Sequence, residues 1–447
     1  MCSMTQRLEK VTDTFANTIR YIIRHLTGRP DCHADEKVGY TSDERQWQSY
    51  KVVIRPSGFF DDGTYGTAQS LPTLPLKSID GTPIIYGDDT ITRQGDTIIV
   101  NADIVASAYF MMARYEEYAD TSNDKRDCHD RFMGKESLAH RAGFLDRPIV
   151  EEYGRLLRKW LREAGEQIDE PETEISHYYI THDLDMPLYS KTLRGVLGAA
   201  RRGNAIEGIR NFMAATESNK YFTFPMLKGE CDKLRNAHEG KVSEIVFVKS
   251  TVNGNIEKED LPTYNLQDRH IKEVIEYLKD NGFEIGLHTS YYSGRHPHNT
   301  KEEASKLRLE TGLDVTKNRY HYLRTLRPQD YQSLVDAGIT DDFTLGYADV
   351  AGFRTGTCRK YRWINPENGE VAQSLWIHPM IMMDCTVGDK KYMNLSEDEG
   401  LDTMKKLIDQ TRQHNGEATI LFHNSVFCDE SYDYEKLYKG IIAELRK

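Results

Sequence analysis

Short strand-like segments alternate with helical segments through the second part of the chain, and this alternation restricts the possible fold more than any other feature. Seven segments are predicted as strands from their β-branched and aromatic residues: 178–183, 244–250, 283–289, 319–324, 339–344, 374–384 and 418–424. Helical segments separate most of them, and several of these end in glycine. Repeated strand–helix units predict an α/β fold with a parallel sheet, arranged as a distorted (β/α)7-type barrel.

The first 170 residues have a different sequence pattern, in which strand-like and helical segments do not alternate regularly. We predict three strands and two helices here: 51–56, 82–87 and 96–101, then 102–119 and 147–166. The acidic stretch 166–174, which contains Pro171, is predicted to be a linker. The chain of 447 residues is therefore predicted to have an N-terminal α+β domain of unknown role (1–170) and a barrel domain (175–447).

Charge and composition exclude several classes of partner. The formal net charge of −12 argues against nucleic acid as the main partner, because phosphate binding needs a basic face. No apolar run approaches the roughly 18 residues of a membrane span, and the start of the chain has no apolar core of the signal-peptide type. Seven scattered cysteines without a CxxC motif indicate reduced thiols and predict a cytoplasmic protein. The oligomeric state cannot be predicted.

Acid–base and metal-ligand residues follow four of the predicted strands, at the ends where function collects in such barrels. These residues are His182, Asp183 and Asp185, then His288, then Arg319 and His321, and finally His423 with Asn424. A single buried histidine is usually an ordinary core residue, and "THDLD" alone could be a turn that caps the next helix. Four such strand ends together favour a divalent metal shell of imidazole and carboxylate, with spare groups for acid–base catalysis.

The order of motifs also resembles a known family. "THDLD", "GLHTSYYS", "RYHYLR" and "LFHN" resemble the motifs of the polysaccharide deacetylase superfamily, the NodB-homology domains of carbohydrate esterase family four. "ASAYFMMARYEEY" and "HDRF" resemble the N-terminal domain of unknown role in a bacterial subgroup, so the resemblance covers nearly the whole chain. It implies a metal-dependent hydrolase, most simply a zinc enzyme, that removes acetyl groups from an N- or O-acetylated carbohydrate.

Carried over position by position, the resemblance implies a role for each motif residue. Asp183 becomes the general base, Asp185 and His288 become metal ligands, and His423 becomes the general acid. In the family a further ligand stands where this chain has Tyr292. We predict His321 as the third ligand.

Two alternatives for the third ligand stay open. The loop pair His296 and His298 could supply it, or the site could have too few ligands to hold a metal. Arg319, Tyr292 and Arg354 are predicted to bind substrate, although Arg354 could instead brace its own loop. The runner-up function is a non-catalytic carbohydrate-binding or assembly protein on a degenerate barrel. An HD-type phosphohydrolase is excluded, because that motif belongs on helices and "HD" here ends a strand.

Overall fold

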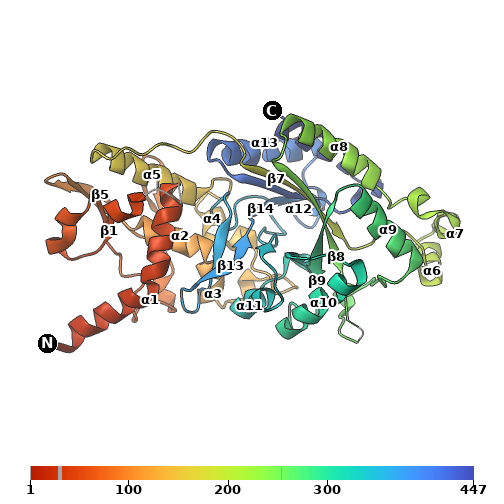
Figure 1. Cartoon of the computed structure of the whole chain (residues 1–447), viewed down its shortest axis with the longest axis horizontal. Coiled ribbons are helices and arrows are strands. Elements are labelled where there is room, and N and C mark those ends of the chain that lie inside the picture. The colour runs from red at the N-terminus through yellow and green to blue at the C-terminus, as the bar shows by residue number, and fades with distance from the viewer. Residues whose placement is uncertain (1, 29–32, 253) are drawn as a thin grey trace. The chain divides into compact units, whose positions relative to one another are not determined.

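The computed structural model describes residues 2–28, 33–252 and 254–447 (Figure 1). The chain forms two compact units, each built from three segments. The first unit contains Met1–Ile175, Gly352–Pro379 and Gln410–Gly416, and the second contains Ser176–Ala351, Met380–Asp409 and Glu417–Lys447. The domain bounds 1–170 and 175–447 stay a prediction, and two later segments also belong to the first unit.

Seven parallel strands form the sheet of the second unit, which confirms the predicted α/β class. They are β7 (His177–Leu184), β8 (Val242–Lys249), β9 (Glu284–Thr289), β10 (Lys317–Tyr320), β11 (Asp341–Asp342), β14 (Met380–Met383) and β15 (Glu417–Leu421). Their order in space is β11-β10-β9-β8-β7-β15-β14, and every neighbouring pair is parallel. The first and last predicted strands, β7 and β15, are neighbours as expected.

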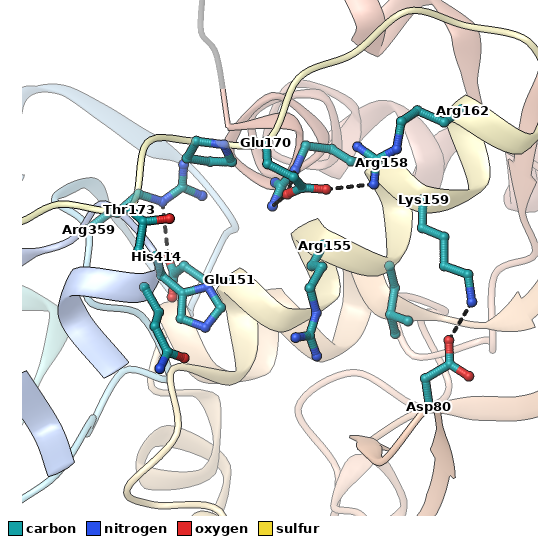
Figure 2. Close-up of a pocket in the computed structure, with 13 residues that line it drawn as sticks. Asp80, Glu151, Arg155, Arg158, Lys159, Arg162, Glu170, Thr173, Arg359 and His414 are labelled. Carbon is teal, nitrogen blue, oxygen red and sulfur yellow. Dashed lines mark hydrogen bonds and ion pairs between the residues drawn. The ribbon is translucent and has the colours of Figure 1, made fainter. Parts of the chain in front are cut away.

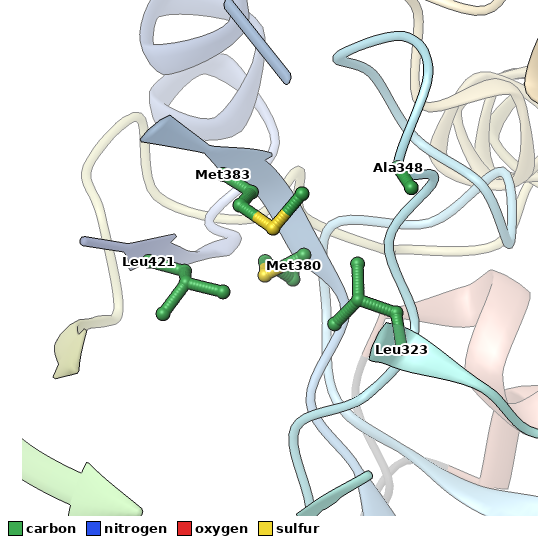
Figure 3. Close-up of a cluster of buried hydrophobic side chains, with 5 residues drawn as sticks. All are labelled: Leu323, Ala348, Met380, Met383 and Leu421. Atoms are coloured by element: carbon green, nitrogen blue, oxygen red, sulfur yellow. The ribbon is translucent and has the colours of Figure 1, made fainter. Parts of the chain in front are cut away.

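This strand order is a circular permutation of the chain order, which is what a barrel requires. Among the described strands, no ladder joins β11 to β14, and we call this place the seam. Among the described residues the seam between β11 and β14 is bridged by a backbone hydrogen bond from the Met380 N–H to the Leu345 carbonyl, at 3.0 Å. A buried cluster of Leu323, Ala348, Met380, Met383 and Leu421 packs beside it (Figure 3). Packing of apolar side chains therefore contributes where strand pairing stops.

The helices of the second unit stand between its strands. They are α6 (Leu193–Arg201), α7 (Ala205–Met213), α8 (Phe224–Ala237), α9 (Arg269–Asp280), α10 (Thr300–Thr311), α11 (Pro328–Asp336), α12 (Asp384–Gly388), α13 (Glu397–Gln413) and α14 (Tyr434–Leu445). The division between the units falls within α13. These helices follow the predicted alternation along the chain.

Two predicted strands differ in the structure. The segment 319–324 leaves the extended conformation after Tyr320, because Tyr322 and Leu323 have positive φ angles of 61° and 54°. The segment 374–384 is two strands, with β13 (Val371–Ile377) in an antiparallel pair and β14 in the parallel sheet. The break falls at His378–Pro379, where proline lacks the N–H that a ladder needs.

The first unit combines helices with a four-stranded sheet, a two-stranded sheet and an antiparallel pair of strands. Its strands are β1 (Val38–Tyr40), β2 (Val52–Ile54), β3 (Lys77–Ile79), β4 (Thr82–Ile84), β5 (Gly87–Gln94), β6 (Thr97–Ala102), β12 (Tyr361–Ile364) and β13. Its helices are α1 (Cys2–Thr27), α2 (Ile104–Met112), α3 (Tyr115–Ala119), α4 (Leu138–Arg141) and α5 (Ile149–Glu163). The predicted helix 102–119 is interrupted at Arg114, whose φ is 52°.

A buried carboxylate on α5 holds the later segment Gly352–Pro379 to the first unit. Glu151 accepts hydrogen bonds from the Thr357 hydroxyl at 2.5 Å and from the Cys358 N–H at 3.3 Å. It also forms an ion pair with Arg359 at 3.1 Å. Because Glu151 is buried and multiply bonded, this contact is expected to be costly to break.

The cysteine and membrane predictions can be compared with the described part of the chain. The five cysteines placed there, Cys128, Cys231, Cys358, Cys385 and Cys428, are all free thiols. Cys32 and the side chain of Cys2 lie outside the described residues. None of the described helices has the length and apolar character needed to cross a bilayer.

Candidate metal and acid–base site

The functional side chains of the second unit come from the C-terminal ends of neighbouring strands. Asp183 lies near the end of β7 and Asp185 just after it, while His288 lies on β9. His321 follows β10 directly, and His423 comes two residues after β15. Since the carboxyl ends of parallel strands meet at one edge of a sheet, the fold brings these residues together.

Asp185, His288 and His321 form a cluster suited to hold a metal ion. One ligand atom from each lies within 4.8 Å of the others. Oδ1 of Asp185 is 3.3 Å from Nε2 of His288 and 3.2 Å from Nε2 of His321. The predicted set of three ligands is therefore assembled in the structure, and its imidazole and carboxylate donors suit zinc and other divalent transition metals.

Two of these ligand atoms are buried and have no hydrogen-bond partner. They are Oδ1 of Asp185 and Nε2 of His288. Nδ1 of His288 lies 2.9 Å from the Arg319 carbonyl, which can only accept a hydrogen bond, so Nδ1 carries the proton. When the His288 imidazole is neutral, Nε2 is then an acceptor, and it lies 3.3 Å from the Asp185 Oδ1 acceptor. Buried acceptors that lack a hydrogen bond are costly, and a bound cation would satisfy both.

The charge balance of the cluster also favours a cation beside Asp185. Burial alone would raise the pKa of Asp185, but the cationic groups of His321 and Lys249 hold it well below its ordinary value. Burial would lower the pKa of His321, and the Asp185 carboxylate raises it above the ordinary value. Asp185 is thus an ionised carboxylate, partly exposed but with Oδ1 buried, that attracts either protons or a metal ion.

Lys249 is a member of this cluster that the sequence analysis missed. Its buried ammonium lies 3.6 Å from Oδ1 of Asp185. Nζ also lies 3.4 Å from the Asp260 carbonyl and 3.3 Å from the Pro262 carbonyl. A lysine directly after the apolar run 245–248 of a predicted strand was the available signal. Lys249 therefore partly neutralises Asp185 and competes with a metal for it.

Asp183 is held by a buried arginine. Oδ1 of Asp183 accepts a hydrogen bond from Arg319 at 3.0 Å, and Oδ2 lies 3.6 Å from Nε2 of His288. Arg319 is fully buried and also donates to the Thr181 hydroxyl at 2.8 Å. Burial would raise the pKa of Asp183, but His288 and Arg319 hold it below its ordinary value. Asp183 is therefore an ionised carboxylate next to the ligand cluster, as a general base must be.

His423 is oriented by a second aspartate. Nδ1 of His423 lies 3.0 Å from Oδ1 of Asp384, and the His423 backbone N–H donates to Oδ2 of Asp384 at 2.6 Å. Burial would lower the pKa of His423, but the Asp384 carboxylate raises it well above the ordinary value. Nε2 of His423 lies 3.6 Å from Oδ2 of Asp185. A protonated imidazole thus faces the cluster, as a general acid requires.

Asp384 was also missed from the sequence, although it closes the segment "SLWIHPMIMMD" at the end of β14. Together with Cys385 and His423 it forms a second group of possible metal ligands. The Asp384 carboxylate is already engaged by His423 and by the Cys385 N–H at 2.6 Å. This second group is therefore better understood as an acid with its orienting carboxylate.

The remaining sequence candidates are placed elsewhere. The ring of Tyr292 stacks on His296 with centroids 4.0 Å apart, and its N–H donates to Asp260 at 3.1 Å. The metal-ligand groups found among the described residues contain neither His296 nor His298. Arg354 belongs to the first unit, where it donates to Glu117 at 2.9 and 2.7 Å.

The motif "THDLD" contains one residue that points away from the cluster. His182 is fully buried, and its Nδ1 lies 2.9 Å from the Phe422 carbonyl. Its Nε2 lies 3.6 Å from Oε1 of Glu244. Strand alternation directs His182 and Asp183 to opposite sides, so His182 is a core residue.

The first unit contains a separate cavity of about 680 Å³ along one face of α5 (Figure 2). Four of its five lysine or arginine side chains already pair with carboxylates. These pairs are Arg158 and Arg162 with Glu170, Lys159 with Asp80, and Arg359 with Glu151. None of the predicted site residues lines this cavity.

Comparisons with known proteins give a family match over part of the chain and distant structural likenesses. Residues 4–166 match a family of unknown function, DUF7033. A search of curated proteins finds no match for the chain. A protein described as a polysaccharide deacetylase from Mycobacterium smegmatis has a similar structure, with a TM-score of 0.40 and 16% identity over 62% of this chain and 86% of that chain.

A second solved structure, Agd3, is described as a novel carbohydrate deacetylase. It has a TM-score of 0.31 and 10% identity, and the match covers 67% of this chain and 54% of that chain. Both likenesses are distant, so the geometry of the cluster carries the functional argument.

Proposed function

We propose that the chain is a metal-dependent hydrolase that removes acetyl groups from an N- or O-acetylated carbohydrate. The observation that carries this proposal is the convergence of two unpartnered buried ligand atoms, on Asp185 and His288, with His321. The Arg319-bound Asp183 and the Asp384-bound His423 stand beside them. Ligands, base and acid are the parts that metal-assisted hydrolysis needs.

Asp185, His288 and His321 would hold the ion, and we propose zinc as the resident metal. When bound there, a divalent cation polarises an acyl carbonyl and acidifies water. Asp183 accepts a proton from the attacking water, and Arg319 keeps this carboxylate ionised and oriented. His423 donates the Nε2 proton to the leaving amine or alcohol, while Asp384 stabilises the imidazolium. The products are acetate and the free sugar amine or hydroxyl.

The same proposal has three further parts. The substrate class is an acetylated carbohydrate, the catalytic domain is the barrel over residues 175–447, and the location is cytoplasmic. The motif order described above supports the substrate class, and the near-cyclic strand order supports the barrel. The free thiols of the described cysteines accord with the proposed location.

Metal analysis and activity test the proposal together. The full chain, stripped with a chelator and reloaded with zinc, should bind about one ion and release acetate from an acetylated chito-oligosaccharide. Exclusion of zinc from the Asp185 cluster would overturn the metal-dependent mechanism. Zinc binding without acetate release from N- and O-acetylated sugars would overturn the substrate class.

A second function is favoured by Lys249, whose ammonium lies 3.6 Å from Oδ1 of Asp185. If this ammonium replaces the metal, the barrel is a carbohydrate-binding protein without catalysis. Calorimetry with the same oligosaccharide then shows binding by the metal-free chain, and zinc analysis shows no stoichiometric ion. The two functions therefore give opposite results in the same pair of measurements.

A further inference from the structure

A helical hairpin of the second unit exposes five large apolar side chains. The exposed fractions on α6 are 73% for Leu193 and 63% for Leu197, and those on α7 are 86% for Ile206, 55% for Ile209 and 76% for Met213. Half of the ten large apolar residues exposed in the described chain thus lie between residues 193 and 213. Single exposed apolar residues are ordinary, but such a concentration indicates a contact surface.

The exposed residues form a stripe on each helix, and the two helices pack together through other residues. Leu193 and Leu197 are spaced i, i+4, and Ile206 and Met213 are spaced i, i+7, so each pair lies on one helix face. Gly208 of α7 meets Ala199 of α6 so closely that a Cβ at Gly208 would come within 2.7 Å of the Ala199 Cβ. Gly208 and Ala199 therefore lie where α6 and α7 contact each other, and the exposed stripes remain uncovered.

Basic residues border both stripes. Arg201 follows Leu197 by four residues, and Arg210 follows Ile206 by four, so each arginine continues a stripe. Residues 191–213 contain five lysines and arginines and one acid, Glu207, which gives a net charge of +4. The carboxylate of Glu207 binds Lys220 at 2.8 Å. Neither Arg201 nor Arg210 has an ion-pair partner in the described part of the chain.

This charge contrasts with the rest of the protein. The whole chain has a formal charge of −12, so the residues outside 191–213 together carry −16. An anionic partner is therefore repelled by the rest of the chain and attracted by this hairpin. The partner must also accept apolar side chains, which a polyanion such as nucleic acid does not.

We propose that the α6–α7 hairpin docks on an anionic lipid membrane. The exposed leucine, isoleucine and methionine side chains enter the interface between headgroups and acyl chains, and the arginines contact lipid phosphates. The long aliphatic parts of the arginines can lie along the apolar region while their guanidinium groups reach the headgroups. The protein then lies on the membrane without spanning it.

The base of the hairpin is bound to residues of the candidate site. Asn424, the residue after His423, donates to the Met186 carbonyl at 3.0 Å and to the Tyr221 carbonyl at 2.9 Å. Asn219 donates to the Tyr189 carbonyl and accepts from the Tyr189 N–H, both at 2.8 Å. The hairpin thus begins and ends at segments tied to the strand ends that carry the cluster.

Sedimentation of the full chain with lipid vesicles tests the proposal. The two vesicle types are phosphatidylcholine alone and phosphatidylcholine with an equal part of phosphatidylglycerol. We expect binding to the anionic vesicles only. The double variant Ile206→Ser, Met213→Ser should abolish this binding, and Arg201→Gln with Arg210→Gln should weaken it by about five-fold for each charge removed.

A matched control variant exists on α10, where Leu309 is 82% exposed and stands outside the hairpin. Leu309→Ser should bind vesicles as the parent chain does, and all variants should retain the parent circular dichroism spectrum. The proposal is overturned if the parent chain does not sediment with anionic vesicles. It is also overturned if the double variant binds these vesicles as well as the parent chain does. A dimer in light scattering that becomes monomeric in the double variant assigns the surface to a second copy and also overturns it.

Discussion

The Asp384 carboxylate contacts His423 twice, once at the imidazole Nδ1 and once at the backbone N–H. The side chain and the main chain of His423 are therefore held by the same group, and the free Nε2 is turned toward Asp185. Such a double contact holds the Nδ1 proton of the imidazole and fixes the direction of the ring. It also raises the pKa of His423 well above its ordinary value.

Asp384→Asn should lower kcat by about 10²–10⁴, the range expected when general acid–base catalysis is lost. The amide cannot stabilise the imidazolium form of His423 as the carboxylate does. Zinc content should stay unchanged, because Asp384 is outside the proposed ligand set. Initial rates and metal analysis check this, with the exposed Asp402→Asn on α13 as the charge-matched control. Loss of zinc in Asp384→Asn would move this aspartate into the metal site.

His321→Ala should lower zinc affinity by more than the roughly 10–100-fold that follows loss of an outer-shell partner. One of only three protein ligands is removed, and the remaining Asp185 and His288 cannot complete the shell. The double variant His296→Ala, His298→Ala is the control and should bind zinc as the parent chain does. Competition with a zinc-sensitive dye measures both affinities. A reversed ranking would place the third ligand in the loop.

Asp185→Asn and Asp183→Asn should separate ligand from base. Asp185→Asn should lose both zinc and activity, since its Oδ1 is the atom that both histidines approach. Asp183→Asn should keep zinc and lose about 10²–10⁴ in rate, because only proton transfer is affected. Zinc content and acetate release are measured on the same preparations. Equal zinc loss in both variants would make Asp183 a ligand as well.

Arg319→Met should lower the free energy of unfolding by about 3–5 kcal/mol, because it leaves the buried Asp183 carboxylate without its partner. Removing both charges, in Arg319→Met with Asp183→Leu, should restore much of this loss. Urea unfolding followed by tryptophan fluorescence gives the comparison. A double variant that is less stable than either single variant would show that the pair is not what stabilises this part of the core.

Stability should depend on pH through Glu303, which is buried on α10. Burial raises the pKa of Glu303 from 4.5 to about 7. Between these values the folded chain holds a proton that the unfolded chain has lost. Stability from this group is therefore complete below about pH 4.5 and falls as pH rises to about 7, by about 3 kcal/mol in total. Thermal unfolding of Glu303→Gln across this window should show a smaller decline than the parent chain.

Residues that end regular strands were predictable, because alternation and strand position locate them. Asp185, His288 and His321 were all named from the sequence, and the structure brings their ligand atoms together. Lys249 was not predicted as a member of the cluster, since its distance to Asp185 depends on how the strand ends are staggered. Asp384 was not predicted, because the segment 374–384 was interpreted as a single strand. In the structure, an antiparallel strand and a parallel strand meet there, and their pairing partners are set by tertiary structure.

The parts of the fold that follow from strand–helix alternation were also predictable from the sequence. Strand–helix alternation predicted the parallel sheet and the pairing of β7 with β15. The bend after Tyr320 was not predictable, because Tyr322 and Leu323 are residues that rarely adopt positive φ. The open seam between β11 and β14 also depends on tertiary packing and leaves no periodic signal.

The bonds of Glu151 to Thr357, Cys358 and Arg359 have a consequence for proteolysis. A protease that cuts within the acidic stretch 166–174 breaks the first of the backbone connections between the two units. The N-terminal fragment nevertheless stays bound to the later segment Gly352–Pro379. The nicked protein therefore migrates as two fragments in denaturing gels and as one particle in gel filtration. Release of the N-terminal region requires unfolding of the first unit, because residues 352–379 of the same chain are part of that unit.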